Sequence, residues 1–406
     1  MTEAAPHLRR RIGVGLLTLY GVGVMVGAGI YVLVGEAAGQ AGDWAPLAFL
    51  IAGLVAAPTA ASYGELAARF PEAGGEAAYL REAFGLPGLP QLAAVMICGG
   101  ATISAAAVLQ GGVGYLRDLV PLPSATLIVA MGLLLGVAAL AGVLESLTLA
   151  AAFTLAEVGG LLFVSGAGLF GAPAAETSAE AAAAQAVVEG VPLAGLAAAA
   201  LLGFFAFIGF EDMVNIAEET EDAPRAVPRA IGLALAITAA LYALVVFAAL
   251  RAVPAAELAA SERPLSLVVD RALGWGGPLL STVAIFAAMN GVLAQIVMAS
   301  RLIYGASRDV PALRVLATVN ARFGTPGRTT ALATALVIGV AATVPLLELA
   351  TTSATILLMA FCAMNAALIR LHRRGPAPAG VFRVPRWTPW LGLVASLAAL
   401  AAPWVV

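Results

Sequence analysis

Residues 21–35 read GVGVMVGAGIYVLVG, a stretch that is apolar enough to cross a membrane and yet carries five glycines. Glycine inside a helix costs about 1 kcal/mol relative to alanine, so Gly27-Ala28-Gly29 at mid-span predicts a break. In lipid, freed backbone groups are tolerated only where they face protein or a wet cavity. Because N–H groups at a helix start attract anions, we predict that this break forms half of a substrate site.

The composition of the whole chain is that of a polytopic membrane protein. It has 406 residues, of which 61% are hydrophobic and 11% charged, with a mean hydropathy of +0.97. Soluble domains carry about 25% charged residues. The apolar runs recur along the whole length, so we predict an all-α fold in a lipid bilayer with no nucleic-acid partner. No cleavable signal peptide is expected before the first span.

Eleven apolar spans can be counted, each near or above the roughly 20 residues that a membrane-spanning helix needs. They cover residues 13–38, 44–68, 88–116, 124–142, 147–170, 192–217, 229–252, 276–304, 329–347, 351–371 and 387–405.

The arginines set the predicted orientation. All 21 basic residues are arginine, and with a cytoplasmic N-terminus 17 of them fall in inner segments. The outer segments hold Arg117, Arg251, Arg263 and Arg271. Since cytoplasmic loops carry the positive excess, we predict a multi-pass protein of the cell inner membrane with its N-terminus in the cytoplasm.

Four connecting segments have distinct compositions. We expect residues 69–85 to form a short surface helix, and 171–191 to be a solvated acidic loop. The charged, proline-rich segment 218–230 predicts a water-exposed connection. The basic segment 372–386 is expected to face anionic lipid at the inner leaflet.

A second interruption is predicted in the sixth span, where Phe207-Ile208-Gly209-Phe210 is followed by Glu211 and Asp212. Carboxylates at membrane depth are costly, and a helix break would hydrate or pair them. Interrupted helices at matching positions of two halves indicate an inverted repeat with substrate bound between the breaks. The alternative is that these glycines only allow close helix packing.

The repeat interpretation divides the chain into five parts. They are a cytoplasmic N-terminus (1–12), a first five-helix repeat (13–170), an external loop (171–191), a second five-helix repeat (192–371), and a cytoplasmic loop plus eleventh helix (372–406).

Four stretches resemble the amino acid–polyamine–organocation (APC) superfamily of transporters. They are GVGVMVGAGIYVLVG (21–35), GFFAFIGFEDMVNIAEETEDAPRAVPRAI (203–231), SRLIYGASRDVPAL (300–313) and FRVPRW (382–387). The resemblance implies a LeuT-type fold with two inverted five-helix repeats, discontinuous first and sixth helices and alternating access. It also implies secondary active transport of an amino acid, with no cofactor and no metal site. Members usually have twelve spans, one more than is counted here.

The resemblance also implies roles for residues at the two breaks. Backbone N–H groups around Gly27, Ala28, Gly29 and Ile30 would hold the substrate carboxylate. Carbonyls near Val24 and Met25, and from Phe205 through Phe207 to Ile208, would meet the ammonium group, with Gly209 leaving room for the substrate. Candidate gate residues are Phe204 and Phe207, which alternatively pack against lipid or the core. Glu211 and Asp212 are further candidates, paired with Arg69, Arg225 or Arg301, unless they are simply solvated.

The same resemblance bears on what drives transport. Sodium-coupled relatives use hydroxyls on the eighth span, where this chain has Ala287 and Ala288, so we expect no sodium coupling. Sodium-independent members often have a lysine in the fifth span, where this chain has Glu157. A carboxyl within a span is a proton-carrier candidate, so we predict a proton symporter or an exchanger. A structural, hydrogen-bonded carboxyl is the alternative.

Other function classes fit less well. His7 and His372 lie outside the predicted spans and no H-E-x-x-H motif occurs, so an intramembrane enzyme is not expected. The repeated filter motifs that are typical of channels do not occur in the sequence. A polyamine or organic-amine transporter and a transporter-fold sensor stay open. A neutral amino acid is slightly favoured over a cationic one, because no acidic residue other than Glu211 is expected near the substrate side chain.

Overall fold

A computed structural model describes residues 12–71, 75–86, 88–142, 147–171, 193–309, 311–320, 325–378 and 380–405. Within these residues the regular structure is helical, apart from an isolated bridge between Ile12 and Thr220. The α-helices are α1 (Val14–Ala41), α2 (Ala45–Arg69), α3 (Gly75–Phe84), α4 (Leu89–Leu119), α5 (Ser124–Leu140), α6 (Leu147–Phe170), α8 (Leu193–Phe207), α9 (Ala223–Ala252), α10 (Ala255–Ala259), α11 (Pro264–Leu273), α12 (Gly277–Asp309), α13 (Gly327–Thr343), α14 (Leu346–Arg374) and α15 (Thr388–Val405). Three 3₁₀ helices are η1 (Gly42–Trp44), η2 (Glu211–Glu219) and η3 (Pro311–Leu316).

Each of the eleven predicted spans contains a helix, but fewer are long enough to qualify alone. Within the described residues, seven helical stretches are long and apolar enough to cross a membrane. They are Gly29–Arg69, Leu89–Leu119, Ala151–Phe170, Leu193–Glu219, Ala223–Ala252, Gly277–Ser307 and Leu346–Arg374. Four apolar helices are shorter: Val14–Gly27, Ser124–Leu140, Gly327–Thr343 and Thr388–Ala402. The first is short because α1 is interrupted at Gly27.

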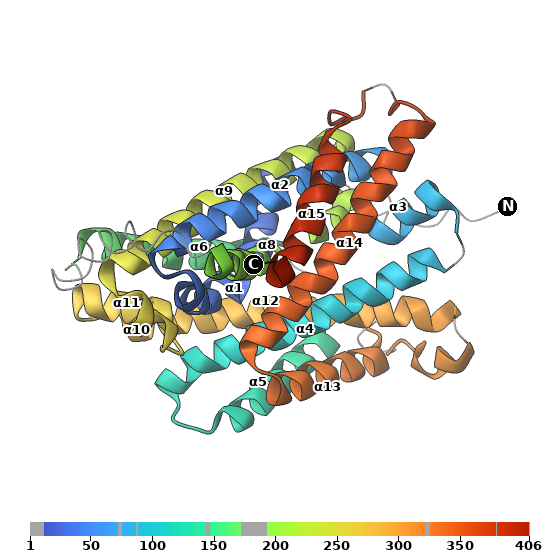
Figure 1. The fold of residues 1–406 in the computed structure, drawn as a ribbon. Coiled ribbons are helices and arrows are strands. Elements are labelled where there is room, and N and C mark those ends of the chain that lie inside the picture. The colour runs from blue at the N-terminus through green and yellow to red at the C-terminus, as the bar shows by residue number, and fades with distance from the viewer. Residues whose placement is uncertain are drawn as a thin grey trace.

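The helices surround α1 and α8, which lie in the middle of the bundle (Figure 1). On one side α2 packs along α9, and on the other α4 packs along α12. The α1 side chains Leu17, Val26 and Val34 are fully buried. By contrast α5 and α15 expose apolar side chains such as Leu134 and Val394, as expected for surfaces that face lipid. The two interrupted segments are therefore placed in the protein core.

The predicted outer segments meet at one end of the bundle. Arg117 pairs with Glu262 at 2.6 Å, and Arg263 pairs with Asp118 at 3.0 Å. These ion pairs join the end of α4 to the segment before α11. The short helices α10 and α11 in this region were not predicted from the sequence. The ion pairs confirm that these predicted outer segments share one end, whereas the orientation in the membrane stays a prediction.

Several predicted boundaries and environments are wrong. The helix predicted over 329–347 ends at Thr343, because Pro345 precedes the next helix, which begins at Leu346. The segment 372–386 begins inside α14 and its first residue, His372, is buried, so its predicted start is wrong, whereas its expected contact with anionic lipid stays a prediction. The connection 218–230 is only partly exposed, since α9 begins at Ala223 and buries Val227 and Pro228. The predicted external loop 171–191 lies outside the described residues except for Gly171.

The short helix predicted within residues 69–85 is present as α3, but one face of it is buried. Its side chains Glu76, Tyr79 and Leu80 are almost inaccessible to solvent. The Tyr63 hydroxyl of α2 donates a hydrogen bond to Oε1 of Glu76 at 3.3 Å. Burial raises the pKa of the Glu76 carboxyl from 4.5 to about 7.

This raised pKa predicts a stability that depends on Glu76 and on pH. The folded state binds the Glu76 proton more tightly than the unfolded state, so its contribution is full below pH 4.5 and is lost as pH rises to about 7. We expect Glu76→Gln to reduce the loss in the free energy of unfolding over this pH range by up to about 3 kcal/mol. The measurement is the melting temperature in detergent as a function of pH. Glu82→Gln, on the exposed face of α3, should leave the profile unchanged. A Glu76→Gln profile that matches the parent would show that Glu76 does not titrate in this range.

Candidate functional site

The first interruption lies at Gly27, in the middle of α1. Its backbone angles, φ 4° and ψ −154°, are not helical, and they separate two helical halves. The neighbouring side chains of Met25, Val26 and Ile30 are buried. The break therefore faces protein, the environment in which a membrane helix tolerates freed backbone groups.

The second interruption follows α8, which ends at Phe207. Residues 208–210 form a turn, and the chain continues as the 3₁₀ helix η2 from Glu211. Gly209 has φ 127°, a conformation that L-residues with side chains rarely adopt. The Gly209 N–H donates a hydrogen bond to Oε2 of Glu211 at 2.9 Å.

The two interruptions lie directly against each other. A Cβ placed on Gly209 would be 3.2 Å from the Met25 backbone nitrogen and 2.6 Å from a Val24 methyl carbon. A Cβ on Gly29 would be 3.2 Å from Cα of Ala206. Glycines at these positions let the two backbones approach more closely than side chains would allow. The two breaks are therefore in direct contact with each other.

A tyrosine from a third helix reaches carbonyls on both interrupted helices. The Tyr242 hydroxyl of α9 lies 2.6 Å from the Met25 oxygen and 2.9 Å from the Ala206 oxygen. A hydroxyl has one proton to donate, so it shares that proton between the two carbonyls. Tyr242 was not predicted from the sequence. The available signal was a tyrosine within the apolar span 229–252, because a buried tyrosine hydroxyl usually has a hydrogen-bond partner.

A small cavity of about 20 Å³ lies beside the second interruption. It is lined by Val24, Ile97, Ala101, Ser104, Ile208, Gly209, Glu211, Asp212, Gln295, Met298 and Leu357. Gln295 of α12 donates a hydrogen bond to the Ser104 hydroxyl of α4 at 3.0 Å. Its Oε1 atom is buried and has no partner among the described residues. The cavity thus combines apolar walls with polar groups that are not fully satisfied.

The structure brings part of the predicted site to this cavity. Val24, Ile208, Gly209, Glu211 and Asp212 line it, whereas Met25, Gly27, Gly29 and Ile30 lie in the first interrupted helix without lining it. The predicted aromatic residues do not line it either. Phe204 packs on Phe361, with ring centres 5.8 Å apart, and Phe207 packs on Tyr242 at 5.1 Å.

One expectation about Glu211 and Asp212 changes. Arg69 pairs with Glu65 at 2.6 Å and Arg225 pairs with Asp222 at 3.7 Å, so neither of these arginines pairs with the proposed gate. Asp212 lines the cavity together with Glu211, so a second acidic residue lies beside the one expected there. The preference for a neutral substrate stays a prediction.

Glu157 lies on α6 and is only 2% exposed. Its Oε1 accepts a hydrogen bond from Asn290 Nδ2 of α12 at 3.3 Å, whereas its Oε2 is buried with no partner among the described residues. Its backbone carbonyl accepts a hydrogen bond from the Tyr31 hydroxyl of α1 at 2.7 Å. Glu157 is thus placed between the first interrupted helix and α12.

Comparison with known proteins identifies the family. The sequence profile described as amino acid permease matches residues 14–406, which is nearly the whole chain. The chain belongs to the amino acid permease family. This permease is therefore a multi-pass membrane protein of amino-acid transport, within the APC superfamily that the sequence motifs indicate.

Relatives of the permease span several kingdoms. An uncharacterized transporter of Mycobacterium tuberculosis is 35% identical over 338 residues, covering 83% of the permease and 74% of the relative. The branched-chain amino acid permease BcaP of Bacillus subtilis is 27% identical and covers 95% and 85% of the two chains. A vacuolar cationic amino acid transporter 4 of Arabidopsis thaliana is 29% identical, covering 75% of the permease and 54% of the relative.

Proposed function

We propose that the permease carries out sodium-independent secondary active transport of amino acids across the cytoplasmic membrane by alternating access. The observation that supports this proposal is the contact between the two interruptions, at Gly27 and at residues 208–210, in the core of the bundle. A helix start attracts the carboxylate of a zwitterion, and freed carbonyls suit its ammonium group. Proton symport or exchange is the proposed mode.

The proposed binding mode assigns each end of the substrate to one kind of backbone group. The carboxylate would be held by N–H groups from Gly27 to Ile30. The ammonium group would take the Met25 and Ala206 carbonyls, which the Tyr242 hydroxyl contacts in this structure. An ammonium has three N–H donors, so it can satisfy both carbonyls at once, which one hydroxyl proton cannot do. Tyr242 would then hold the site together in the absence of substrate.

Alternating access is supported by the size of the cavity. A volume of 20 Å³ is enough for about one water molecule. An amino acid therefore requires the helices around the site to move apart. In the proposed mechanism the repeats 13–170 and 192–371 move relative to each other around the fixed site. Phe204, Phe207, Glu211 and Asp212 remain the candidate gate residues.

Two α12 residues support coupling without sodium. They occupy the positions where sodium-coupled relatives have hydroxyl side chains. Ala287 and Ala288 are fully buried and offer no side-chain oxygen, and Ala288 packs against Gly112 of α4. Sodium in proteins requires several oxygen ligands, as other hard cations do. Glu157 is the proposed proton carrier, because an ionised carboxylate buried without a cation is costly and a protonated one is not.

A cationic substrate is a second candidate, favoured by the acidic groups at the cavity. Glu211 and Asp212 both line it, and none of its lining residues is basic. Two carboxyl groups in a wall without any basic side chain would attract a positively charged side chain or a simple amine. Amino acids with cationic side chains, and polyamines, therefore belong in any test of the substrate.

The experiment that tests the proposed function uses the purified permease in two measurements. A thermal-shift screen against the twenty amino acids and common polyamines should show stabilisation by a subset, since a ligand of the folded state raises its stability. Liposomes loaded with that ligand should then show saturable counterflow of the labelled ligand, without any sodium requirement. Stabilisation by ligands without counterflow would instead indicate a sensor, and stabilisation by none of them would contradict the proposal.

A further inference from the structure

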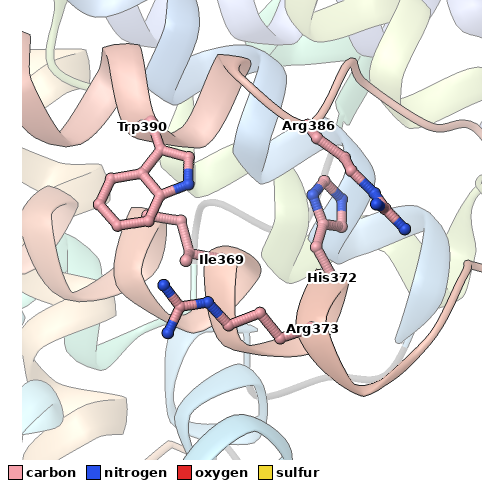
Figure 2. A pocket seen from close by; sticks show the side chains of 5 residues that line it. All are labelled: Ile369, His372, Arg373, Arg386 and Trp390. Atoms are coloured by element: carbon pink, nitrogen blue, oxygen red, sulfur yellow. The ribbon is translucent and has the colours of Figure 1, made fainter.

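A second cavity, of about 240 Å³, lies between the end of α14 and the start of α15 (Figure 2). Ile369, His372, Arg373, Arg386 and Trp390 line it, and none of them lines the cavity beside the second interruption. Two of the five carry a positive charge, a third is a histidine, and none is acidic. The cavity therefore has the electrostatic character of an anion site.

The two arginines have no carboxylate partner within the described residues. The guanidinium of Arg373 lies over the ring of Trp390, 5.6 Å from its centre, which orients the arginine without neutralising it. Arg386 is exposed and comes from the segment that joins the two helices. The neighbouring Arg374 is different, because it donates a hydrogen bond to the Glu82 carbonyl at 2.7 Å.

His372 forms the buried wall of this cavity and provides an independent indication of a ligand. Its Nε2 lies 2.8 Å from Oε1 of Glu65, and its side chain is 7% exposed. The Nδ1 atom is buried and has no partner among the described residues. An unsatisfied buried polar atom in a cavity wall is costly unless a ligand or water completes it.

The carboxylate behind His372 does not cancel the positive charge of the cavity. Glu65 is fully buried and accepts hydrogen bonds from Arg69 at 2.6 and 2.9 Å. It also accepts one from the Val384 N–H at 2.8 Å. Arg69 therefore compensates Glu65, and the charges of Arg373 and Arg386 remain available to an anion. Guanidinium groups bind phosphate oxygens with paired hydrogen bonds.

The surroundings of the cavity indicate where such an anion comes from. Trp390 lies at the start of α15, and tryptophan is enriched at the membrane–water interface. Val394 and Leu397 follow on the same face of α15 and are 59% and 51% exposed, as expected for side chains in contact with acyl chains. Basic pockets between membrane helices bind anionic headgroups. We propose that this cavity binds the phosphate of an anionic membrane lipid, whose acyl chains lie along α15.

The experiment compares binding of three probes to the purified full-length permease. The probes are phosphatidylglycerol, phosphatidylcholine with the same chains, and inorganic phosphate at the same concentration. Binding is followed by the melting temperature in detergent and by native mass spectrometry. Phosphatidylglycerol should bind and stabilise the parent protein, and the double variant Arg373→Gln/Arg386→Gln should bind it roughly 25-fold more weakly, since each arginine contributes about five-fold.

The matched control is Arg383→Gln, which removes the same charge from the same segment at a residue that does not line the cavity. It should bind phosphatidylglycerol like the parent. Equal weakening in Arg383→Gln, or unchanged binding in the double variant, would overturn the site. Equal binding of phosphatidylcholine would overturn the requirement for an anionic headgroup. Equal stabilisation by inorganic phosphate would assign the site to a soluble phosphate and overturn the lipid.

Discussion

Replacing Gly209 by alanine is expected to lower amino acid uptake roughly 100-fold while the permease still folds. The new Cβ would lie 2.6 Å from a Val24 methyl carbon and 3.1 Å from the Val24 carbonyl carbon, so the two interrupted helices would have to separate. Alanine would also be strained at φ 127°. Strain of this kind costs about 1–3 kcal/mol, and near 3 kcal/mol it corresponds to a rate or affinity change of roughly 100-fold.

The measurement is initial uptake of the ligand found in the thermal-shift screen, by permease reconstituted in liposomes at equal protein density. Gly99→Ala is the matched control, because Gly99 is helical in α4 and a Cβ there meets nothing within 4 Å. It should transport like the parent. Size-exclusion and melting profiles of Gly209→Ala separate a damaged site from a misfolded protein. Full uptake by a well-folded Gly209→Ala would mean that close contact of the two interruptions is not needed for transport.

Local backbone chemistry explains why the interruptions could be predicted from the sequence. Gly27 and Gly209 are costly in a helix, and Glu211 and Asp212 next to Gly209 make an intact lipid-facing helix still more costly. These signals lie within a few residues of the break that they predict. The length and apolar character of the spans are also local properties, and for this reason the helices were found close to their predicted positions.

Contacts between distant parts of the chain could not be predicted in the same way. Tyr242 lies 217 residues from Met25, and His372 lies 307 residues from Glu65. Nothing in the sequence around these residues indicates which distant residue each of them contacts. Glu65 lies near the end of α2, but the partners that bury it come from α14 and the segment after it. The paired arginines show the same limit, since Arg69 is satisfied by a neighbour one helical turn away rather than by Glu211 or Asp212.

Glu157→Gln is expected to abolish the uptake that a pH gradient drives, with a loss of at least about 10-fold, because a proton carrier must ionise during the cycle. Glutamine keeps the shape of the side chain, and its carbonyl oxygen can still accept the hydrogen bond from Asn290. Its amide group would replace Oε2, which has no partner among the described residues. The α1–α6–α12 packing should therefore survive, and substrate exchange should continue.

The two liposome assays distinguish a coupling role of Glu157 from a structural one. Counterflow with equal pH on both sides requires only substrate binding and movement of the loaded carrier, whereas accumulation against a gradient requires the proton as well. A coupling residue affects the second assay and spares the first, but a carboxyl that merely joins α6 to α12 affects both through stability. Glu348→Gln, an exposed carboxyl at the start of α14, is the matched control and should change neither assay. If Glu157→Gln accumulates substrate in response to a pH gradient as the parent does, the proton is not carried by Glu157.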